Sequence, residues 1–206
     1  MTTWAIVPVK GFERGKSRLG PLLAPDARHA LSIALFRRVL YACTGCPAID
    51  HVLVASDSAR VITPSARVSL LIDAAPHPPF AKVLDAALAH AHAHGATRAI
   101  IAMADLPLIE PRDVAEMCFA LSAAQVAVAP DRMRRGVGAV ACRLPAPLKM
   151  QLGHADSFAR TMREARLREA RVALVNNPRI ARDLDTATDM NGLGLSKLPL
   201  VTFIRT

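Results

Sequence analysis

The feature that most limits the fold of this chain is the regular alternation of short apolar runs with longer amphipathic stretches. Helical patterns cover residues 25–42, 80–94, 111–122 and 157–167. Runs typical of strands cover residues 5–9, 51–55, 68–72, 98–103, 126–129, 138–142 and 172–175. Most of these runs do not alternate polar with apolar side chains, which indicates strands buried on both faces. We therefore predict an α/β fold, a three-layer sandwich with a mostly parallel sheet.

Length and composition indicate how large this fold is and where in the cell the protein is expected. The chain has 206 residues, 52% of them apolar, so it can bury a sizeable core and we expect a single domain over residues 1–206. Aromatic residues make up 4%, which suits a helix-covered sheet better than an aromatic-rich β-sandwich. No apolar run is long enough to span a bilayer, and the first residues lack the pattern of a secretory signal. We expect a cytoplasmic protein that does not act at a membrane.

An excess of positive charge gives the first indication of the ligands. Lys and Arg number 26 against 17 Asp and Glu, a formal net charge of +9. Such a surface attracts anions, which include nucleic acids, acidic membranes and phosphorylated metabolites. Few aromatic side chains are available to stack on bases, and no nucleic-acid-binding motif is present, so we expect no nucleic-acid partner. Small phosphorylated ligands are favoured as partners. The sequence is also compatible with a homodimer.

The segment after the first predicted strand combines glycines with cations. Residues 9–18 read VKGFERGKSR, which places two glycines among four basic side chains. Glycines let the backbone approach phosphates closely, and the basic side chains attract them. The glycine spacing is one residue short of a P-loop, and no helix follows directly. A structural basic loop is one interpretation; we favour the other, a nucleotide-phosphate loop of a different type.

Two further segments supply carboxylates. Asp105 follows the apolar run 98–103, and Asp183 and Asp185 stand two residues apart near the C-terminus. A strand that delivers a carboxylate into a cleft commonly holds Mg²⁺, although Asp105 by itself could also stand in an ordinary turn. On an extended segment Asp183 and Asp185 point the same way. One of them could complete a metal site with Asp105, while the other caps the helix that follows.

Five motifs occur together in one order and carry a resemblance to a known family. They are VPVKGFERGKSRL near the start, ADLPLI, APDR at 129–132, DSFARTMREA at 156–165 and ARDLDTATDM near the end. This set resembles the 2-phospho-L-lactate guanylyltransferase family, which acts in the biosynthesis of the deazaflavin coenzyme F-420. The family is related to the molybdenum-cofactor and sugar nucleotidyltransferases. The resemblance spans nearly the whole chain and implies a nucleotidyltransferase fold of the glycosyltransferase-A-like type.

The resemblance also implies a nucleotide site and a metal site. GTP, or another nucleoside triphosphate, would bind at the first loop through Gly11, Gly15 and Ser17. The cations of the same loop would act in catalysis, namely Lys10, Lys16 and Arg18. Asp105 and Asp185 would hold the cofactor Mg²⁺. Loss of Lys16 is therefore expected to weaken triphosphate binding with little change in thermal stability.

The acceptor would be a phosphorylated three-carbon acid, and here the chain departs from the family pattern. The family's G-L-N is replaced by Val83-Leu84-Asp85, which puts Asp85 at a nucleotide-binding position. The family's G-T-G-T-N after APDR is replaced by residues 134–138, RRGVG, and its G-x-G-S by residues 154–157, HADS. The expected acceptor-binding residues are Arg134, Arg135, Gly136, His154 and Ser157. Two arginines in this loop suggest an acceptor that is larger or more anionic than phospholactate.

These residues predict a nucleotidyltransferase. It would move a nucleoside monophosphate, GMP by resemblance, from its triphosphate to 2-phospholactate, phosphoenolpyruvate or 3-phosphoglycerate and release pyrophosphate. No general base is required, because the attacking phosphate oxygen is already ionised near neutral pH. One alternative is a P-loop-type kinase or NTPase, which would yield a nucleoside diphosphate. The other is a non-catalytic descendant that binds nucleotides or a partner protein.

Overall fold

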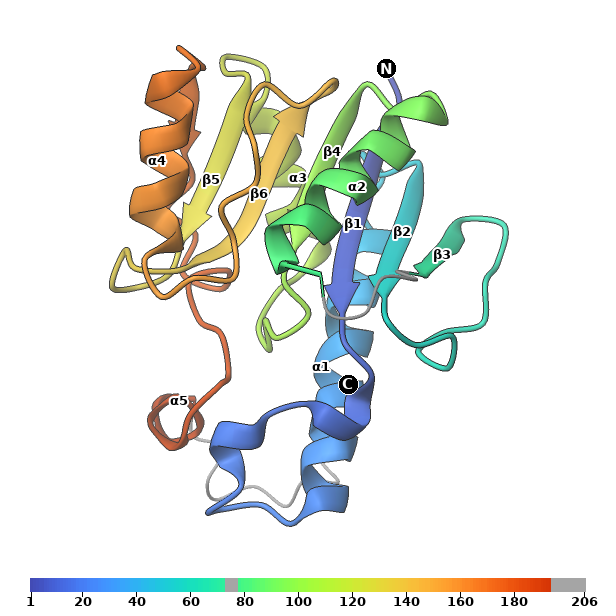
Figure 1. Cartoon of the computed structure of the whole chain (residues 1–206), viewed down its shortest axis with the longest axis vertical. Coiled ribbons are helices and arrows are strands. Elements are labelled where there is room, and N and C mark those ends of the chain that lie inside the picture. The colour runs from blue at the N-terminus through green and yellow to red at the C-terminus, as the bar shows by residue number, and fades with distance from the viewer. Residues whose placement is uncertain (73–77, 194–206) are drawn as a thin grey trace.

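A seven-stranded mixed sheet forms the centre of the computed structural model, which describes residues 1–72 and 78–193 (Figure 1). The strands are β1 (Thr3–Val9), β2 (His51–Ser56), β3 (Val68–Ile72), β4 (Arg98–Ala102), β5 (Val126–Pro130), β6 (Val137–Arg143) and β7 (Val172–Leu174). Their spatial order is β3-β2-β1-β4-β6-β5-β7. β6 runs antiparallel to β4 and β5, and the other four neighbouring pairs are parallel. The predicted α/β class with a mostly parallel sheet is confirmed.

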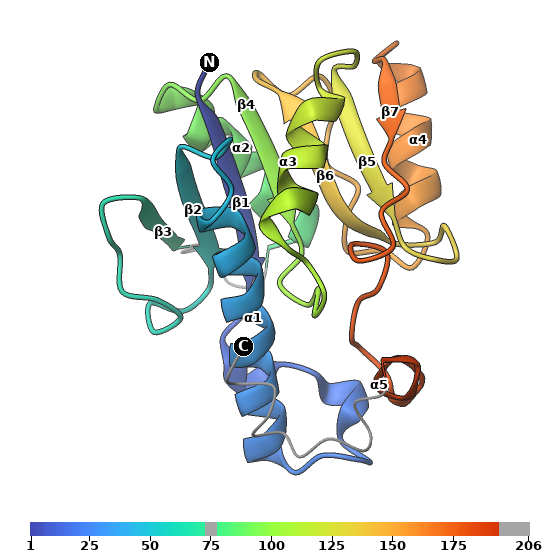
Figure 2. The same ribbon diagram turned by 180° about the vertical axis from the view of Figure 1, so that it is seen from behind.

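Helices cover both faces of the sheet. They are α1 (Pro25–Thr44), α2 (Phe80–Ala93), α3 (Pro111–Ala120) and α4 (Ser157–Leu167), while the short α5 (Ala187–Gly192) lies beyond the edge of the sheet. α2 and α4 lie on the face seen in Figure 1, and α1 and α3 on the opposite face seen in Figure 2. The predicted three-layer sandwich is therefore present. Across the described residues, no helix combines the length and the apolar character needed to cross a membrane.

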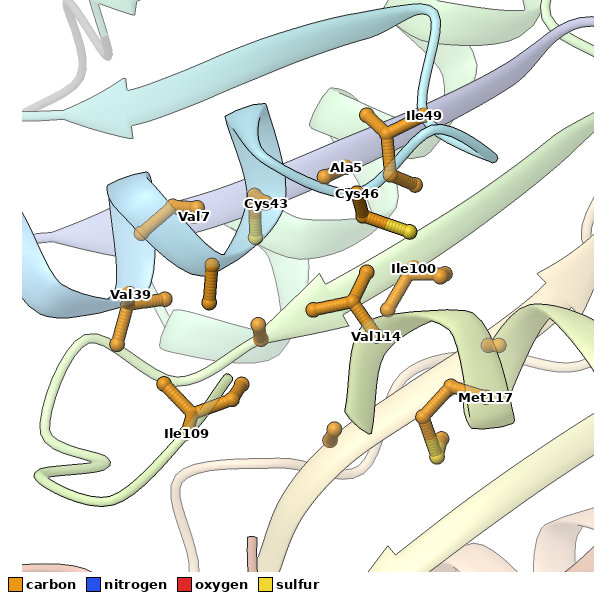
Figure 3. Close-up of a cluster of buried hydrophobic side chains, with 14 of the residues drawn as sticks. Ala5, Val7, Val39, Cys43, Cys46, Ile49, Ile100, Ile109, Val114 and Met117 are labelled. Carbon is orange, nitrogen blue, oxygen red and sulfur yellow. The ribbon is translucent and has the colours of Figure 1, made fainter. Parts of the chain in front are cut away.

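The strand pattern explains how both faces are filled. Along β1 the side chains alternate, so Ala5 and Val7 enter the core under α1 and α3 while Ile6 enters the core under α2. Figure 3 shows Val39 from α1 and Met117 from α3 in the first of these cores. Because both faces of the central strands are buried, their sequences read as continuous apolar runs.

A small satellite core fixes the loops beyond the carboxyl ends of the parallel strands. The N-terminal half of α1 extends past this edge of the sheet, where the first loop and α5 also lie (Figures 1 and 2). Leu19 of the first loop, Leu31 and Leu35 of α1, Leu184 and Met190 form one buried cluster. This cluster ties the N-terminal loop to the C-terminal segment that carries the predicted carboxylates.

Element boundaries differ from the sequence prediction by at most two residues. α1 continues to Thr44, α3 ends at Ala120, and β4 ends at Ala102. The first loop also contains two 3₁₀ helices that were not predicted, η1 (Phe12–Arg14) and η2 (Ser17–Leu19). Periodicity identifies a buried stripe, but the last turn of a helix depends on capping and on its neighbours.

Candidate active site

Lys16 joins the two carboxylates that the sequence predicts as metal ligands. Its Nζ donates to Asp105 Oδ2 at 3.2 Å and to Asp185 Oδ1 at 2.7 Å. The Lys16 side chain is only 9% exposed, compared with 22% for Asp105 and 38% for Asp185. Burial alone would lower the pKa of Lys16, but the two carboxylates outweigh it and raise this pKa above its ordinary value. The structure therefore gathers three predicted site residues from opposite ends of the chain.

The backbone of the first loop brings Lys16 to this position. Lys16 precedes η2 with a φ of 55°, in the left-handed region, which turns the chain between the two 3₁₀ helices. Gly15 lies against α1, where an added Cβ would stand 2.4 Å from Ser32 Oγ. Glycine at this position is thus explained by packing against α1.

A cleft of about 620 Å³ opens beside these ion pairs. Seven of the predicted site residues line it: Arg18, Asp105, Arg135, Gly136, His154, Ser157 and Asp185. Arg18 Nη1 lies 3.7 Å from Asp185 Oδ2, and its side chain is largely exposed. The cleft thus has both basic and acidic side chains on its walls.

Three further carboxylates line the cleft: Asp131, Asp183 and Asp189. The pKa of Asp183 is raised to about 6, first by partial burial of its carboxyl group and then by the charges of Asp105, Asp185 and Asp189. Although part of Asp183 meets solvent, a carboxyl group among three others ionises with difficulty. A cation in the cleft would relieve this repulsion.

The cap of α5 corrects one expectation. The sequence suggested that Asp183 or Asp185 caps this helix, but the N-cap residue is Thr186, whose hydroxyl accepts the Asp189 N–H at 3.3 Å. The Asp189 carboxylate in turn accepts the Thr186 N–H at 2.7 Å, which completes a capping box. Asp183 and Asp185 are thereby both left facing the cleft.

The proposed acceptor side of the cleft is a pair of tightly held loops. The Asp131 carboxylate accepts the N–H groups of Arg135 at 2.9 Å and Gly136 at 2.6 Å. In the second loop the Ser157 hydroxyl donates to the carbonyl of His154 at 2.5 Å. These contacts fix both backbones and leave the Arg135 side chain exposed beside the first turn of α4.

Asp85 lies apart from this cleft. Its Oδ1 accepts the N–H of Met150 at 2.9 Å, and it lines a separate cavity of about 330 Å³ between α2 and the segment 145–149. The structure therefore does not bring Asp85 to the residues that gather around Lys16. The sequence placed it there by motif position alone, and that position carries no information on which way the side chain turns.

The remaining predicted residues stand outside the lining of the cleft among the described residues. Gly11 donates its N–H to Asp57 Oδ1 at 2.8 Å, and Arg134 donates to Asn176 Oδ1 at 3.4 Å. Lys10 and Ser17 are exposed on the first loop. Lys10, Gly11, Gly15 and Ser17 nevertheless belong to the loop that carries Lys16, so they stay candidates for contact with a nucleotide.

The donor set suits a hard divalent cation that brings further ligands with it. Over residues 1–72 and 78–193, no group of three or more His, Cys, Asp or Glu side chains is arranged to hold a metal ion by itself. Asp105 and Asp185, however, direct carboxylate oxygens at one shared ammonium. Mg²⁺ is usually held by one or two carboxylates together with substrate phosphates and water, so two protein ligands fit it.

Comparison with known proteins gives consistent results. The family described as guanylyl transferase CofC like matches residues 3–196. The chain is 34% identical over 193 residues to the phosphoenolpyruvate guanylyltransferase of Sphaerobacter thermophilus, covering 94% of this chain and 93% of that protein. It is 31% identical over 193 residues to the 2-phospho-L-lactate guanylyltransferase of Methanothermobacter thermautotrophicus, covering 92% and 83%.

A solved structure shows the same fold at low sequence identity. It is a candidate nucleotide-diphospho-sugar transferase from Desulfovibrio desulfuricans G20, with a TM-score of 0.78 and 17% identity. The match covers 100% of this chain and 95% of that chain. The predicted fold class is therefore supported by an independent structure as well as by the strand order.

Proposed function

The chain belongs to the CofC-like guanylyl transferase family, as its motifs predicted, and on this premise we propose that it transfers GMP from GTP to a small phosphorylated acid. Pyrophosphate is the second product. The observation that carries the proposal is the contact of Lys16 with both Asp105 and Asp185 at the side of an open cleft. A cation and two carboxylates in contact are the groups that a phosphoryl-transfer site needs for a metal-bound triphosphate.

Lys16 and Arg18 would bind the triphosphate. Arg18 lines the cleft, and Lys16 of the same loop contacts Asp105 and Asp185 in its wall. Lys16 is nearly buried, so its charge acts with little screening by water. In the free protein the Lys16 ammonium is shared by two carboxylates and offsets part of their charge. When the nucleotide binds, the same ammonium would contact phosphate oxygens, and Lys10 would add charge from the exposed side of the loop.

Asp105 and Asp185 would hold Mg²⁺. When bound there, Mg²⁺ would offset the negative charge that builds on the α-phosphate and on the departing pyrophosphate. Asp183 is the additional carboxylate beside them. Its pKa is raised by burial and then by the charges of Asp105, Asp185 and Asp189, and a bound cation would offset that repulsion.

The acceptor would lie at the opposite wall of the cleft, near Arg135, His154 and the first turn of α4. The N-terminus of a helix favours anions, and Ser157 is the first residue of α4. We infer phosphoenolpyruvate as the first acceptor to test, since a relative that spans nearly the whole chain is named for it, with 2-phospholactate and 3-phosphoglycerate next. The acceptor phosphate needs no general base, because its oxygens are already ionised near neutral pH.

The two alternative functions find less support. In a P-loop the lysine begins an α-helix, whereas here Lys16 precedes a 3₁₀ helix and α1 begins only at Pro25. A non-catalytic binding protein would have little need for two carboxylates held against a buried lysine. We retain that second alternative as an outcome of the following test.

The test is a screen for pyrophosphate release. Purified protein is incubated with Mg²⁺, each of the four common nucleoside triphosphates and each of the three acids. We expect release with GTP and phosphoenolpyruvate, and a nucleoside diphosphate product would instead indicate a kinase. Asp105→Asn should lower kcat at least about tenfold, whereas Asp50→Asn, at the other end of the sheet, should not. Intact GTP binding with no release for any pair would favour the non-catalytic alternative.

A further inference from the structure

The segment that carries Asp183 and Asp185 belongs to no helix or strand. After β7 the chain passes through a turn at residues 178–181 and then runs without regular pairing to α5. Two carboxylates that must face Asp105 across a cleft therefore depend on side-chain and loop contacts for their position. Contacts of this kind come from a buried charged cluster at the start of α3.

Asp113 is the centre of this cluster. It lies in the first turn of α3 and is 0% exposed. Its two carboxylate oxygens accept the Arg179 Nε–H at 3.0 and 2.8 Å, and Arg179 Nη2 donates to the same carboxylate. Asn177 Nδ2 donates to it at 2.8 Å, and the Glu110 N–H at 2.9 Å. Burial alone would raise the pKa of Asp113, but these hydrogen bonds and the Arg179 charge lower it, so the group is ionised.

Asn177 shapes the turn that follows. Its side-chain oxygen accepts the N–H groups of Arg179 at 2.9 Å and Ile180 at 3.1 Å, while its backbone carbonyl accepts the Ala181 N–H at 3.0 Å. The Asn177 side chain therefore joins Asp113 to the backbone of the turn. Ion pair and turn form one hydrogen-bonded unit.

The turn packs against β6, the neighbour of the strand β4 that leads to Asp105. Ile180 covers Gly138 of β6, where an added Cβ would stand 2.4 Å from the Ile180 carbonyl oxygen. The Leu184 N–H donates to the backbone carbonyl of Asp105 at 3.1 Å. Because Leu184 stands between Asp183 and Asp185, this hydrogen bond fixes the position of their backbone relative to Asp105.

We propose that Asp113, acting through Arg179 and Asn177, is a positioning residue that holds the 177–185 segment so that Asp183 and Asp185 face Asp105. A buried ion pair adds little net stability compared with apolar side chains of the same shape, because desolvation offsets the attraction. What such a pair supplies is a fixed geometry, and partners one step removed from a metal commonly govern its affinity. The inference rests on the proposed function where it is tested by activity. Where it is tested by the exchange of backbone amides, it rests on the fold alone.

Arg179 offers the cleanest variants, because its side chain is 30% exposed and is not part of the apolar core, although its loss deprives Asp113 of a counter-ion. Arg179→Ala removes the anchor, and Arg179→Lys keeps the charge without the two-point contact. The matched control is Arg143→Ala. Arg143 also donates to loop carbonyls, those of Leu121 at 2.9 Å and Ala124 at 3.2 Å, but at the opposite end of the sheet.

The structural readout is amide hydrogen exchange of the ligand-free chain. We expect the Leu184 amide to exchange at least about tenfold faster in Arg179→Ala than in the wild type, with an intermediate rate in Arg179→Lys and no change in Arg143→Ala. The catalytic readout is taken at a temperature where every variant is folded. Arg179→Ala should lower kcat about 10- to 100-fold and raise the Mg²⁺ concentration for half-maximal rate, with little change in the KM for GTP.

The results separate the two proposals. If the wild type releases no pyrophosphate, the proposed function fails, and the Leu184 exchange rates still decide the positioning role. Wild-type Leu184 exchange and wild-type kcat in Arg179→Ala would overturn the inference. An equal loss in Arg143→Ala would overturn it as well, because the effect would then be one of general stability. If Asp113→Asn folds, it gives a further measurement. The double variant Asp113→Asn with Arg179→Ala should then lose no more kcat than Arg179→Ala alone, because both changes remove the same contact.

Discussion

Replacing Lys16 by methionine tests the site at its centre. Methionine keeps an unbranched apolar chain but removes the ammonium that contacts Asp105 and Asp185. The two carboxylates then lose the counter-ion that they share, while Asp185 keeps its longer contact with the exposed Arg18. The sequence alone predicted little change in thermal stability when Lys16 is lost. Because Lys16 is a nearly buried partner in two ion pairs, we now expect a measurable loss.

The expected size of the effect follows from the exposure of the partners. Hydrogen bonds to charged groups contribute about 1.5–3 kcal/mol, and the lower part of this range applies because Asp185 is 38% exposed and screened by water. A loss of about 2 kcal/mol in the free energy of unfolding lowers the Tm of a chain of this length by about 4–8 °C. The pKa of Lys16 is raised, so its ion pairs are complete at neutral pH and are lost only as the solution becomes strongly alkaline.

Thermal unfolding with and without Mg²⁺ separates this explanation from a general packing defect. Mg²⁺ alone should raise the Tm of Lys16→Met more than that of the wild type, because the carboxylate pair of the variant has no competing ammonium. GTP binding measured by calorimetry should weaken at least about tenfold, the equivalent of one hydrogen bond to a charged group. Lys82→Met, an exposed lysine on α2, is the matched control and should change neither quantity.

Three results would refute the reasoning. A Tm equal to that of the wild type would mean that the carboxylates do not depend on Lys16, and equal GTP affinity would remove the first loop from the nucleotide site. A Tm loss of the same size that Mg²⁺ does not reduce would indicate lost packing in place of lost charge.

Three further variants test other parts of the fold. Since the pKa of Asp183 is raised to about 6, the stability that its protonated form gives is lost as pH rises through that value; Asp183→Asn should raise Tm at about pH 7 and flatten the Tm profile between about pH 4 and 6. Gly138→Ala should cost about 1–3 kcal/mol and lower kcat, because its Cβ would displace Ile180; an unchanged Tm and kcat would contradict the close approach. The pKa values of His51 and His90 are lowered by burial and then by neighbouring basic groups, so stability should fall as pH drops below about 6.5. In a double His→Gln variant at these positions, unfolding curves across that range should show a smaller loss.

Periodicity made most of the fold predictable from the sequence. The strand at residues 68–72 and the helix at 157–167 have the predicted bounds, because turn residues and a change of hydrophobic period flank both. The antiparallel direction of β6 could not be read from its own residues, since a strand buried on both faces looks the same in either direction.

The contact of Lys16 with Asp105 was predictable for a topological reason. β1 and β4 are parallel neighbours, so the loops that follow them emerge at one edge of the sheet. Asp185 was reached by motif resemblance, since the chain returns to this edge only after three further strands, β5, β6 and β7, and the helices α3 and α4. Asp113 gave no signal of its function, because an aspartate in the first turn of a helix is fully explained as a capping residue.

The cleft is acidic although the chain as a whole is basic, and this difference influences which ligand can bind in the cleft. The formal net charge is +9, yet the described lining of the cleft has five aspartates against two arginines and one histidine. A bare triphosphate would be drawn to the basic surface at long range but repelled by these carboxylates at contact. A triphosphate that carries a divalent cation meets the carboxylates with positive charge and the arginines with negative charge. The distribution of charge therefore favours a metal–nucleotide complex as the species that binds. Until that complex arrives, Lys16 offsets part of the charge of two of the carboxylates.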